Sequence, residues 1–212
     1  MARPAEGYRL KDGTRVPGAS TIAKMIADPG ALHWWHWNEG HEGRGYREAL
    51  QAAATAGRMV HEAAECWKHG RPYDFVGPPD VVTKAKRGYD AFLEWTAQTK
   101  LHIEQTEISL VSETYRFGGT FDAVLIGHRR VMCDFKTAGA VYPEMLLQVA
   151  AYGALWEEHH PDQPIEGYYI LRFSREYGDF AAHFYGELRD AWEAFTLCVP
   201  LYTFQKTLAK RV

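Results

Sequence analysis

Hydrophobic positions recur with two different periods along this chain. Within 80–99 the apolar residues Val81, Ala85 and Phe92 are spaced as on one face of a helix. Between 102 and 137 apolar and polar residues alternate, which is typical of strands. The two patterns predict helices over 16–27, 46–69, 80–99, 142–160 and 187–208, and strands over 102–111, 119–127, 130–137, 165–172 and 180–185. This order indicates an α/β fold with a mixed central β-sheet flanked by helices.

Residues with strong local preferences mark some of the helix ends. Ser20 and Thr21 favour the start of a helix, because their hydroxyl groups can accept a hydrogen bond from a free backbone N–H. Pro143 suits the first turn of the helix predicted after the third strand. Pro200 predicts a kink or a break inside the last helix, since proline cannot donate the usual backbone hydrogen bond.

The strand pair over 119–127 and 130–137 carries the most informative side chains. Its connection, 127–130, begins with glycine, as expected for a hairpin. Alternation along the first strand assigns its side chains to two faces: Asp122, Val124 and Ile126 on one, and Phe121, Ala123 and Leu125 on the other.

The acidic residues of this hairpin predict a cation site. If Ile126 pairs with Arg130, Asp122 falls directly opposite Asp134, and Lys136 shares the face of Asp134. Like charges that face each other across a sheet are destabilising unless a cation lies between them. Two carboxylates, a cation and an adjacent ammonium group are suited to metal-assisted attack of water on a phosphodiester.

A charged pair on the surface is the alternative reading of Asp134 and Lys136. Against it, apolar residues surround the pair, and charged side chains are seldom buried unless they are paired or bound to metal. These neighbours are Val131, Met132, Cys133 and Phe135.

Two helices supply further candidates. Gln148 and Tyr152 are four residues apart and therefore project from one helix face. His61 follows Gly57 by four residues in another helix. Either set could equally be packed or solvated side chains. The full ordered set is Gly-x-x-x-His (57–61), Gly-x-x-Asp (119–122), Asp-x-Lys-Thr (134–137) and Gln-x-x-x-Tyr (148–152).

This ordered set resembles the PD-(D/E)XK nuclease superfamily, and within it the RecB-type exonuclease branch, over about residues 16–205. The resemblance implies a restriction-endonuclease-like three-layer core, which agrees with the pattern of elements. It implies a single nuclease domain over 1–212, in which 1–45 form an N-terminal arm and helix and 46–212 form the nuclease core.

The resemblance also implies roles for individual residues. His61, Asp122 and Asp134 match metal ligands, together with the backbone carbonyl of Phe135. Lys136 matches the lysine that orients the attacking water and stabilises developing negative charge, so that Asp122, Asp134 and Lys136 would be the catalytic residues.

Four further positions have weaker matches. Gln148 and Tyr152 match a motif that helps to hold the DNA strand. Glu107 stands where relatives often carry an acidic residue, and Glu62 is a rival for a second metal.

Composition limits the class of protein and its expected location. The 212 residues are 46% hydrophobic and 24% charged, as in an ordinary globular protein. No apolar run approaches the roughly 18 residues of a membrane span, and residues 1–11 do not resemble a signal peptide. We therefore expect a protein without a membrane partner, in the cytoplasm of a bacterium or of a phage-infected host cell.

The three cysteines are too few for a disulfide framework or for a four-cysteine iron–sulfur cluster. This composition favours the phage-like members of the family, which lack the cluster. The expected cofactor is Mg²⁺ or Mn²⁺, because carboxylate oxygens suit Mg²⁺ and an imidazole ligand makes Mn²⁺ equally acceptable.

A net charge of −3 argues against a broad DNA-binding surface and leaves only a local basic groove. The aromatic run 33–37 could stack on unpaired bases or pack against the core. Candidate groove residues are Lys84, Lys86, Arg87, Arg129, Arg130, Arg172, Arg175, Lys206, Lys210 and Arg211.

The function expected from the sequence is a metal-dependent DNA exonuclease acting in DNA processing, recombination or repair. A structure-specific DNA endonuclease of the same fold, a non-catalytic DNA-binding or scaffolding module and an unrelated metal-dependent hydrolase are the alternatives. DNA is the expected partner, with a single-strand binding or annealing protein as a natural second one. Polarity of digestion, strand preference and oligomeric state stay open.

Overall fold

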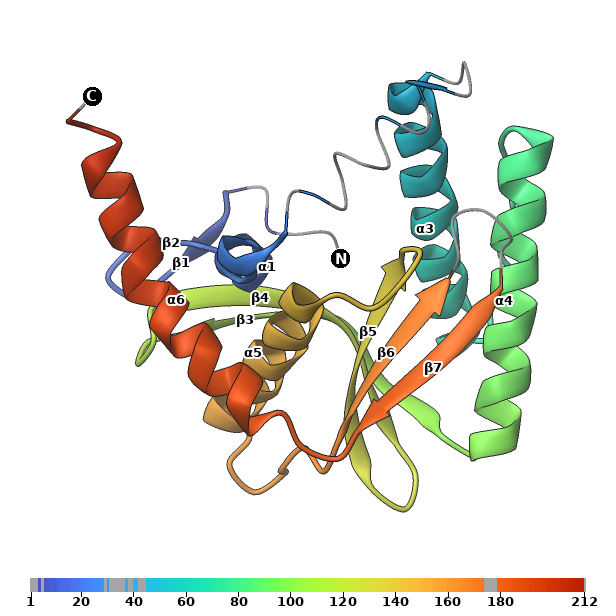
Figure 1. Ribbon diagram of the computed structural model, residues 1–212. Helices are drawn as coiled ribbons and strands as arrows, with labels where there is room; N and C mark the ends of the chain where they lie inside the picture. Colours follow the sequence, from blue (N-terminus) through green and yellow to red (C-terminus); the bar gives the residue numbers. More distant parts are fainter. Residues whose placement is uncertain are drawn as a thin grey trace.

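The computed structural model describes residues 4, 6–28, 30, 37, 40–41, 45–173 and 179–211 (Figure 1). Residues 33–36 of the aromatic run and Arg175 lie outside this part of the chain. The helices are α1 (Ala19–Ala23), the 3-10 turn η1 (Lys24–Ile26), α3 (Tyr46–Lys68), α4 (Pro79–Thr99), α5 (Pro143–His159) and α6 (Arg189–Leu208). The strands are β1 (Tyr8–Arg9), β2 (Arg15–Val16), β3 (His102–Ser112), β4 (Phe117–Ile126), β5 (Arg130–Thr137), β6 (Tyr168–Phe173) and β7 (Phe180–Tyr185).

The five long strands form one mixed sheet in the order β3-β4-β5-β6-β7. Strands β3, β4 and β5 are antiparallel, β5 and β6 are parallel, and β7 is antiparallel to β6. Helix α5 makes the crossover that the parallel pair requires. The predicted mixed central sheet is therefore confirmed. The short β1–β2 hairpin was not predicted, since two-residue strands leave no readable alternation.

Helices cover both faces of this sheet and give a three-layer α/β fold (Figure 1). On one face, α1, α5 and α6 enclose a core around Phe121 and Trp156, both fully buried. On the other face, α3 and α4 enclose a second core around Phe92 and Phe135. The predicted fold class is confirmed. No helix in the described part of the chain has the length and apolar character needed to span a membrane.

The structure corrects one predicted helix start and excludes one predicted helix break. Helix α1 begins at Ala19 after Gly18, without a side-chain cap from Ser20 or Thr21. Gly18 forms a β-bridge with Gly118, so a tertiary contact sets this helix end. Helix α6 continues through Pro200 without a break, because it is packed against the body on both sides of the proline.

The predicted alternation of side chains between the two faces of β4 fails in the middle of the strand. Phe121 joins the α5-side core together with Val124, whereas Ala123 and Leu125 join the α3-side core. The strand thus changes phase around Asp122. Opposite this point, Glu107 of β3 has a φ of 52°, a left-handed conformation that is uncommon for a residue other than glycine. The irregularity lies beside the predicted chemistry, which is where backbone strain is often retained.

Candidate functional site

The candidate site lies where β4 and β5 separate. The paired residues of the hairpin run from Ile126 and Arg130 to Ala123 and Cys133. This is the predicted register, in which Asp122 falls opposite Asp134, but regular pairing ends one position before these two residues. Instead, the backbone N–H of Phe135 donates to Oδ2 of Asp122 at 2.6 Å. Asp122 thus accepts a hydrogen bond from the β5 backbone, whereas Asp134 contacts Lys136 and Gln148.

Asp122 belongs to a group of three side chains from three different elements. Nδ1 of His61, on α3, lies 3.3 Å from Oδ1 of Asp122 and 3.9 Å from Oε1 of Glu107, on β3. One ligand atom from each residue lies within 4.8 Å of the others. The ring of Phe135 contacts the His61 ring edge-on at 5.2 Å between centroids and helps to orient it.

The charges in this group depend strongly on one another. Burial lowers the pKa of His61, but the carboxylates of Asp122 and Glu107 outweigh it and raise that pKa to about 10. Burial alone would raise the pKa of Asp122; His61, Lys136 and the Phe135 N–H lower it instead. Without a metal, the protonated imidazole of His61 therefore balances the two carboxylates.

This donor set fits a divalent cation. Carboxylate oxygens and an imidazole nitrogen are ligands for Mg²⁺ or Mn²⁺, and a cation can take over the balancing charge from the His61 proton. The strained backbone of Glu107 contributes one of the three donors. Glu62 is not part of this group: it accepts a hydrogen bond from the Tyr73 hydroxyl at 2.6 Å.

Asp134 organises a second group next to the first. It is 1% exposed, and its Oδ2 lies 2.6 Å from Nζ of Lys136. Burial raises the pKa of Asp134 to about 6, although the Lys136 ammonium works in the opposite direction. Oδ2 has no hydrogen bond of good geometry in the described structure, so this buried oxygen retains acceptor capacity for a further ligand.

Gln148 of α5 holds this second group in place. Its Oε1 accepts from Nζ of Lys136 at 3.1 Å, and its Nε2 donates to Oδ1 of Asp134 at 3.4 Å. Nε2 also donates to the hydroxyl of Tyr152 at 2.6 Å. The predicted shared face of Gln148 and Tyr152 is confirmed, and in this structure both position the Asp134–Lys136 pair. Their contact with DNA stays a prediction.

Glycines of the sequence motifs allow these close approaches. A Cβ atom on Gly57 would collide with the Thr137 side chain, so only glycine lets α3 lie this close to the end of β5. A Cβ on Gly119 would lie 2.7 Å from the Tyr152 ring. Both glycines therefore act indirectly. Gly57 lets α3 place His61 beside Asp122, and Gly119 leaves room for the ring of Tyr152, which contacts Gln148.

Sequence reasoning missed Tyr8, a further residue that supports the site. Its ring occupies the space where Gly118 lacks a side chain, and its hydroxyl is hydrogen-bonded to Oγ1 of Thr120 at 3.0 Å. Tyr8 and Thr120 are 112 residues apart. No local pattern could have connected them, because the contact exists only after the β1–β2 hairpin packs on β4.

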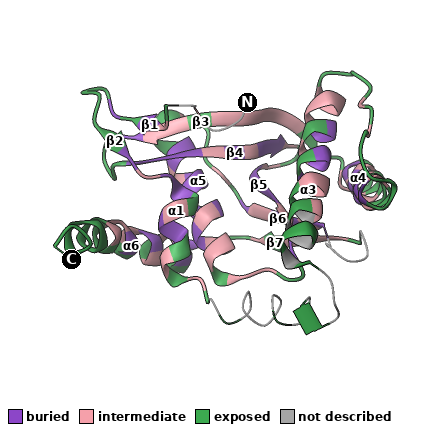
Figure 2. Cartoon of the chain, turned by 90° about the horizontal axis from the view of Figure 1, so that it is seen from above, coloured by how far each residue is buried: buried purple, intermediate pink, exposed green. Residues whose placement is uncertain are grey.

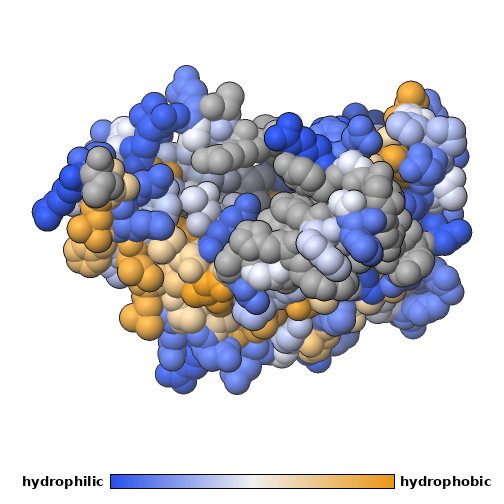
Figure 3. All heavy atoms as spheres, turned by 45° about the horizontal axis from the view of Figure 1, so that its top comes forward, coloured by the Kyte–Doolittle hydropathy of each residue, from blue (hydrophilic) through white to orange (hydrophobic). Residues whose placement is uncertain are grey.

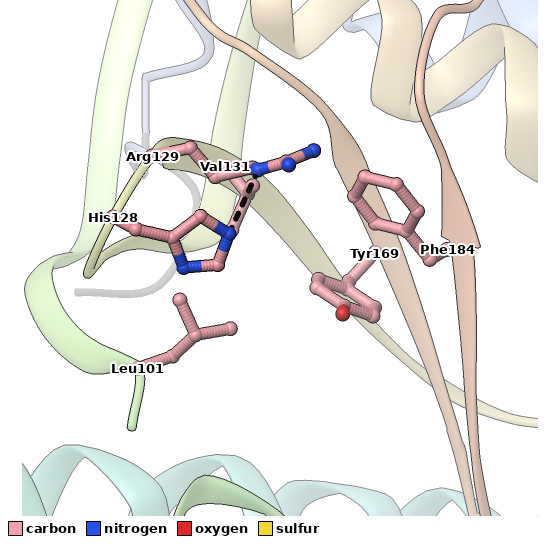
Figure 4. A pocket seen from close by; sticks show the side chains of 6 residues that line it. All are labelled: Leu101, His128, Arg129, Val131, Tyr169 and Phe184. Atoms are coloured by element: carbon pink, nitrogen blue, oxygen red, sulfur yellow. Dashed lines mark hydrogen bonds between the residues drawn. The ribbon is translucent and has the colours of Figure 1, made fainter. Parts of the chain in front are cut away.

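Two cavities of the described structure lie away from these charged groups. A cavity of about 220 Å³ lies at the opposite end of β5 and is lined by Leu101, His128, Arg129, Val131, Tyr169 and Phe184 (Figure 4). A second, of about 370 Å³, lies between the first half of α3 and the start of α4.

The fold and the site define a class of protein. It is a three-layer α/β protein in which two acidic side chains and a histidine lie together where regular strand pairing ends. No protein-family model matches this chain, and no match among curated proteins reaches significance. A solved structure of a protein from Eubacterium rectale, described as a candidate exonuclease, is similar over 94% of this chain and 85% of that one. The TM-score is 0.57 at 11% identity, which shows a shared fold. The crystal structure of SSO0001 aligns over 60% of each chain, with 15% identity and a TM-score of 0.39.

Substitution of Gly57 by alanine tests the close contact of α3 with β5. Alanine favours a helix by about 1 kcal/mol, but its Cβ would push α3 from Thr137 and His61 from Asp122. We expect Mn²⁺ affinity, measured by titration calorimetry, to fall at least about tenfold. Gly139→Ala is the matched control, because a Cβ there meets nothing within 4 Å. Equal affinities for both variants would contradict this role of Gly57.

Substitution of Glu107 by glycine tests whether the strained backbone of this residue is kept because its carboxylate binds a metal. Glycine relieves the left-handed φ, so the free energy of unfolding should rise by roughly 1 kcal/mol. Mn²⁺ affinity should fall at least about tenfold, since one of the three donors is lost. Lys100→Gly, at a φ of 56° at the end of α4, should change stability alone. Unchanged metal affinity in Glu107→Gly would remove Glu107 from the ligand set.

Proposed function

We propose that this protein is a divalent-metal-dependent deoxyribonuclease that digests DNA from an end, in DNA processing, recombination or repair. The observation that carries the proposal is the adjacency of two charged groups on neighbouring strands. One group, His61 with Glu107 and Asp122, fits a cation; the other presents the Lys136 ammonium beside it. The shared fold with a protein described as a candidate exonuclease supports the same class of reaction.

Each group has a distinct task in this proposal. His61, Glu107 and Asp122 would hold Mg²⁺ or Mn²⁺, joined by Asp134 and the carbonyl of Phe135. A divalent cation supplies Lewis-acid stabilisation of the charge on a phosphate during hydrolysis.

The remaining steps depend on side chains of this chain. Lys136 orients the attacking water and stabilises the negative charge that develops on the phosphate oxygens. Gln148 and Asp134 fix the position of its Nζ atom, so the ammonium need not reorganise during the reaction. Tyr152 is 5% exposed and acts through Gln148 as a positioning residue.

Three of the arginines near the sheet already have partners within the described chain. Arg130 forms a two-point ion pair with Glu104, and Arg172 pairs with Asp179. The Arg129 guanidinium lies over the Phe184 ring. This pattern agrees with a local grip on a strand end better than with a broad basic surface. A single-strand binding or annealing protein would be a natural partner for such an enzyme.

An endonuclease of the same fold is the second candidate, because neither the fold nor the two charged groups by themselves require a DNA end. A non-catalytic binding module is disfavoured by the buried Asp134–Lys136 pair. Burying two charges costs several kcal/mol each unless they are compensated, and nothing in DNA binding alone requires it.

Cleavage of linear and covalently closed DNA, with and without Mg²⁺ or Mn²⁺, tests the proposal. We expect metal-dependent loss of linear DNA only, and a decrease of at least about 100-fold in Lys136→Ala, because a preorganised cation is lost. Lys11→Ala, which removes an exposed lysine in the turn between β1 and β2, should cleave at the normal rate.

Lys136→Ala leaves Asp134 buried without its partner, so its thermal unfolding must be compared with that of the unsubstituted protein. Asp134→Asn/Lys136→Met removes both charges and provides a second inactive variant in which no buried charge is left unpaired. Full activity in either folded variant would refute the mechanism. Cleavage of the closed circles would establish the endonuclease instead.

A further inference from the structure

The outer face of α6 carries a stripe of exposed hydrophobic side chains. Leu197, Leu201, Phe204 and Leu208 are 72%, 52%, 65% and 59% exposed. Their spacing of four, three and four residues places them on one face of the helix. In Figure 3, hydrophobic side chains gather on the left flank of the molecule, where α6 lies. Contiguous apolar patches of this kind mark interaction surfaces, whereas single exposed leucines do not.

This stripe is separate from the face that α6 uses for folding. The helix packs on the body through Ala191, Phe195 and Cys198, which are buried in the α5-side core. On an ideal helix these three residues point about 120° away from the stripe, at 100° per residue. The stripe is therefore not needed for the fold of the described chain.

The last turns of α6 extend beyond the body of the protein. Every residue over 203–211 is exposed (Figure 2), and the helix projects past the sheet in Figure 1. A helical segment without packing beneath it gains little stability, since most helix stability in proteins comes from a buried apolar face. Two turns that carry Phe204 and Leu208 thus present a face suited to a partner.

We propose that α6 pairs with α6 of a second copy of this chain in an antiparallel arrangement. The spacing of four, three and four residues reads the same in both directions, so the stripe is complementary to itself. When Leu197 lies opposite the partner's Leu208, Leu201 lies opposite the partner's Phe204, and both contacts occur twice. Such self-complementary contacts are characteristic of twofold dimers.

Charges at the two ends of the stripe favour the antiparallel direction. Asp190 and Glu193 continue the stripe toward the start of α6, and Arg211 continues it beyond Leu208; all three are exposed, and Glu193 also pairs with Arg189 one turn before it at 3.1 Å. In the antiparallel pair, Arg211 lies next to the partner's Glu193. A parallel pair would place acidic residues against acidic residues and Arg211 against the partner's Arg211. Like charges at a helix seam oppose pairing.

The dimer is expected to be reversible, because one pair of helices buries less than the roughly 800 Å² per partner of a standard interface. Sedimentation velocity over a low-micromolar to several-hundred-micromolar series should show a shift toward the mass of two chains. Leu201→Glu/Phe204→Glu should remain a monomer throughout, with an unchanged circular dichroism spectrum. Val76→Glu, at a residue 80% exposed before α4, should dimerise normally.

Direction of pairing is tested with Leu197→Cys/Leu208→Cys under oxidising conditions. The antiparallel pair predicts a disulfide between position 197 and the partner's position 208, identified by peptide mapping. Disulfides between like positions would overturn the arrangement. A monomer at every concentration, a dimer insensitive to Leu201→Glu/Phe204→Glu, or monomers that bind vesicles of anionic phospholipid through this stripe would overturn the dimer itself. None of these outcomes depends on the proposed nuclease activity.

Discussion

Compensation of two carboxylates, the half-buried Asp122 and the buried Asp134, is the constraint on which the rest of the site depends. The two carboxylates are compensated by different partners. Asp122 accepts a backbone hydrogen bond from Phe135 and pairs with His61, whereas Asp134 pairs with Lys136 and accepts from Gln148. Removal of either partner would leave a charge in a poorly solvated position, which is strongly destabilising. The charges therefore determine how closely α3 and α5 must approach the sheet.

The two helical layers contribute opposite parts of this compensation. From one face of the sheet, α3 supplies His61, and Gly57 lets it come close to β5. From the other face, α5 supplies Gln148, and Gly119 leaves room for the ring of Tyr152. Side chains from both layers meet where the regular pairing of β4 with β5 ends. The chemistry thus follows from a local interruption of regular pairing.

Much of this arrangement could be predicted from the sequence because it depends on short-range periodicity. Asp134 and Lys136 lie two residues apart on a strand, and Gln148 and Tyr152 lie one helical turn apart. Mixed sheet topology followed from strands that alternate with a crossover helix. Each of these inferences needs only the geometry of a single element and its immediate neighbour.

The details that could not be predicted depend on irregular backbone or distant contacts. Strict alternation placed Phe121 with Ala123, but the strand changes phase at Asp122, opposite the left-handed Glu107. Tyr8 reaches Gly118 only through the packed β1–β2 hairpin. Glu62 is adjacent to His61 in sequence, yet a helix turns it away toward Tyr73.

The central claim is that His61, Glu107 and Asp122 hold a divalent cation beside Lys136. The most direct measurement is anomalous diffraction from crystals of the protein soaked in Mn²⁺. The account predicts an anomalous peak in contact with carboxylate oxygens of Glu107 and Asp122 and with a ring nitrogen of His61. Well-ordered crystals with a Mn²⁺ peak elsewhere, or with none among these three side chains, would contradict it.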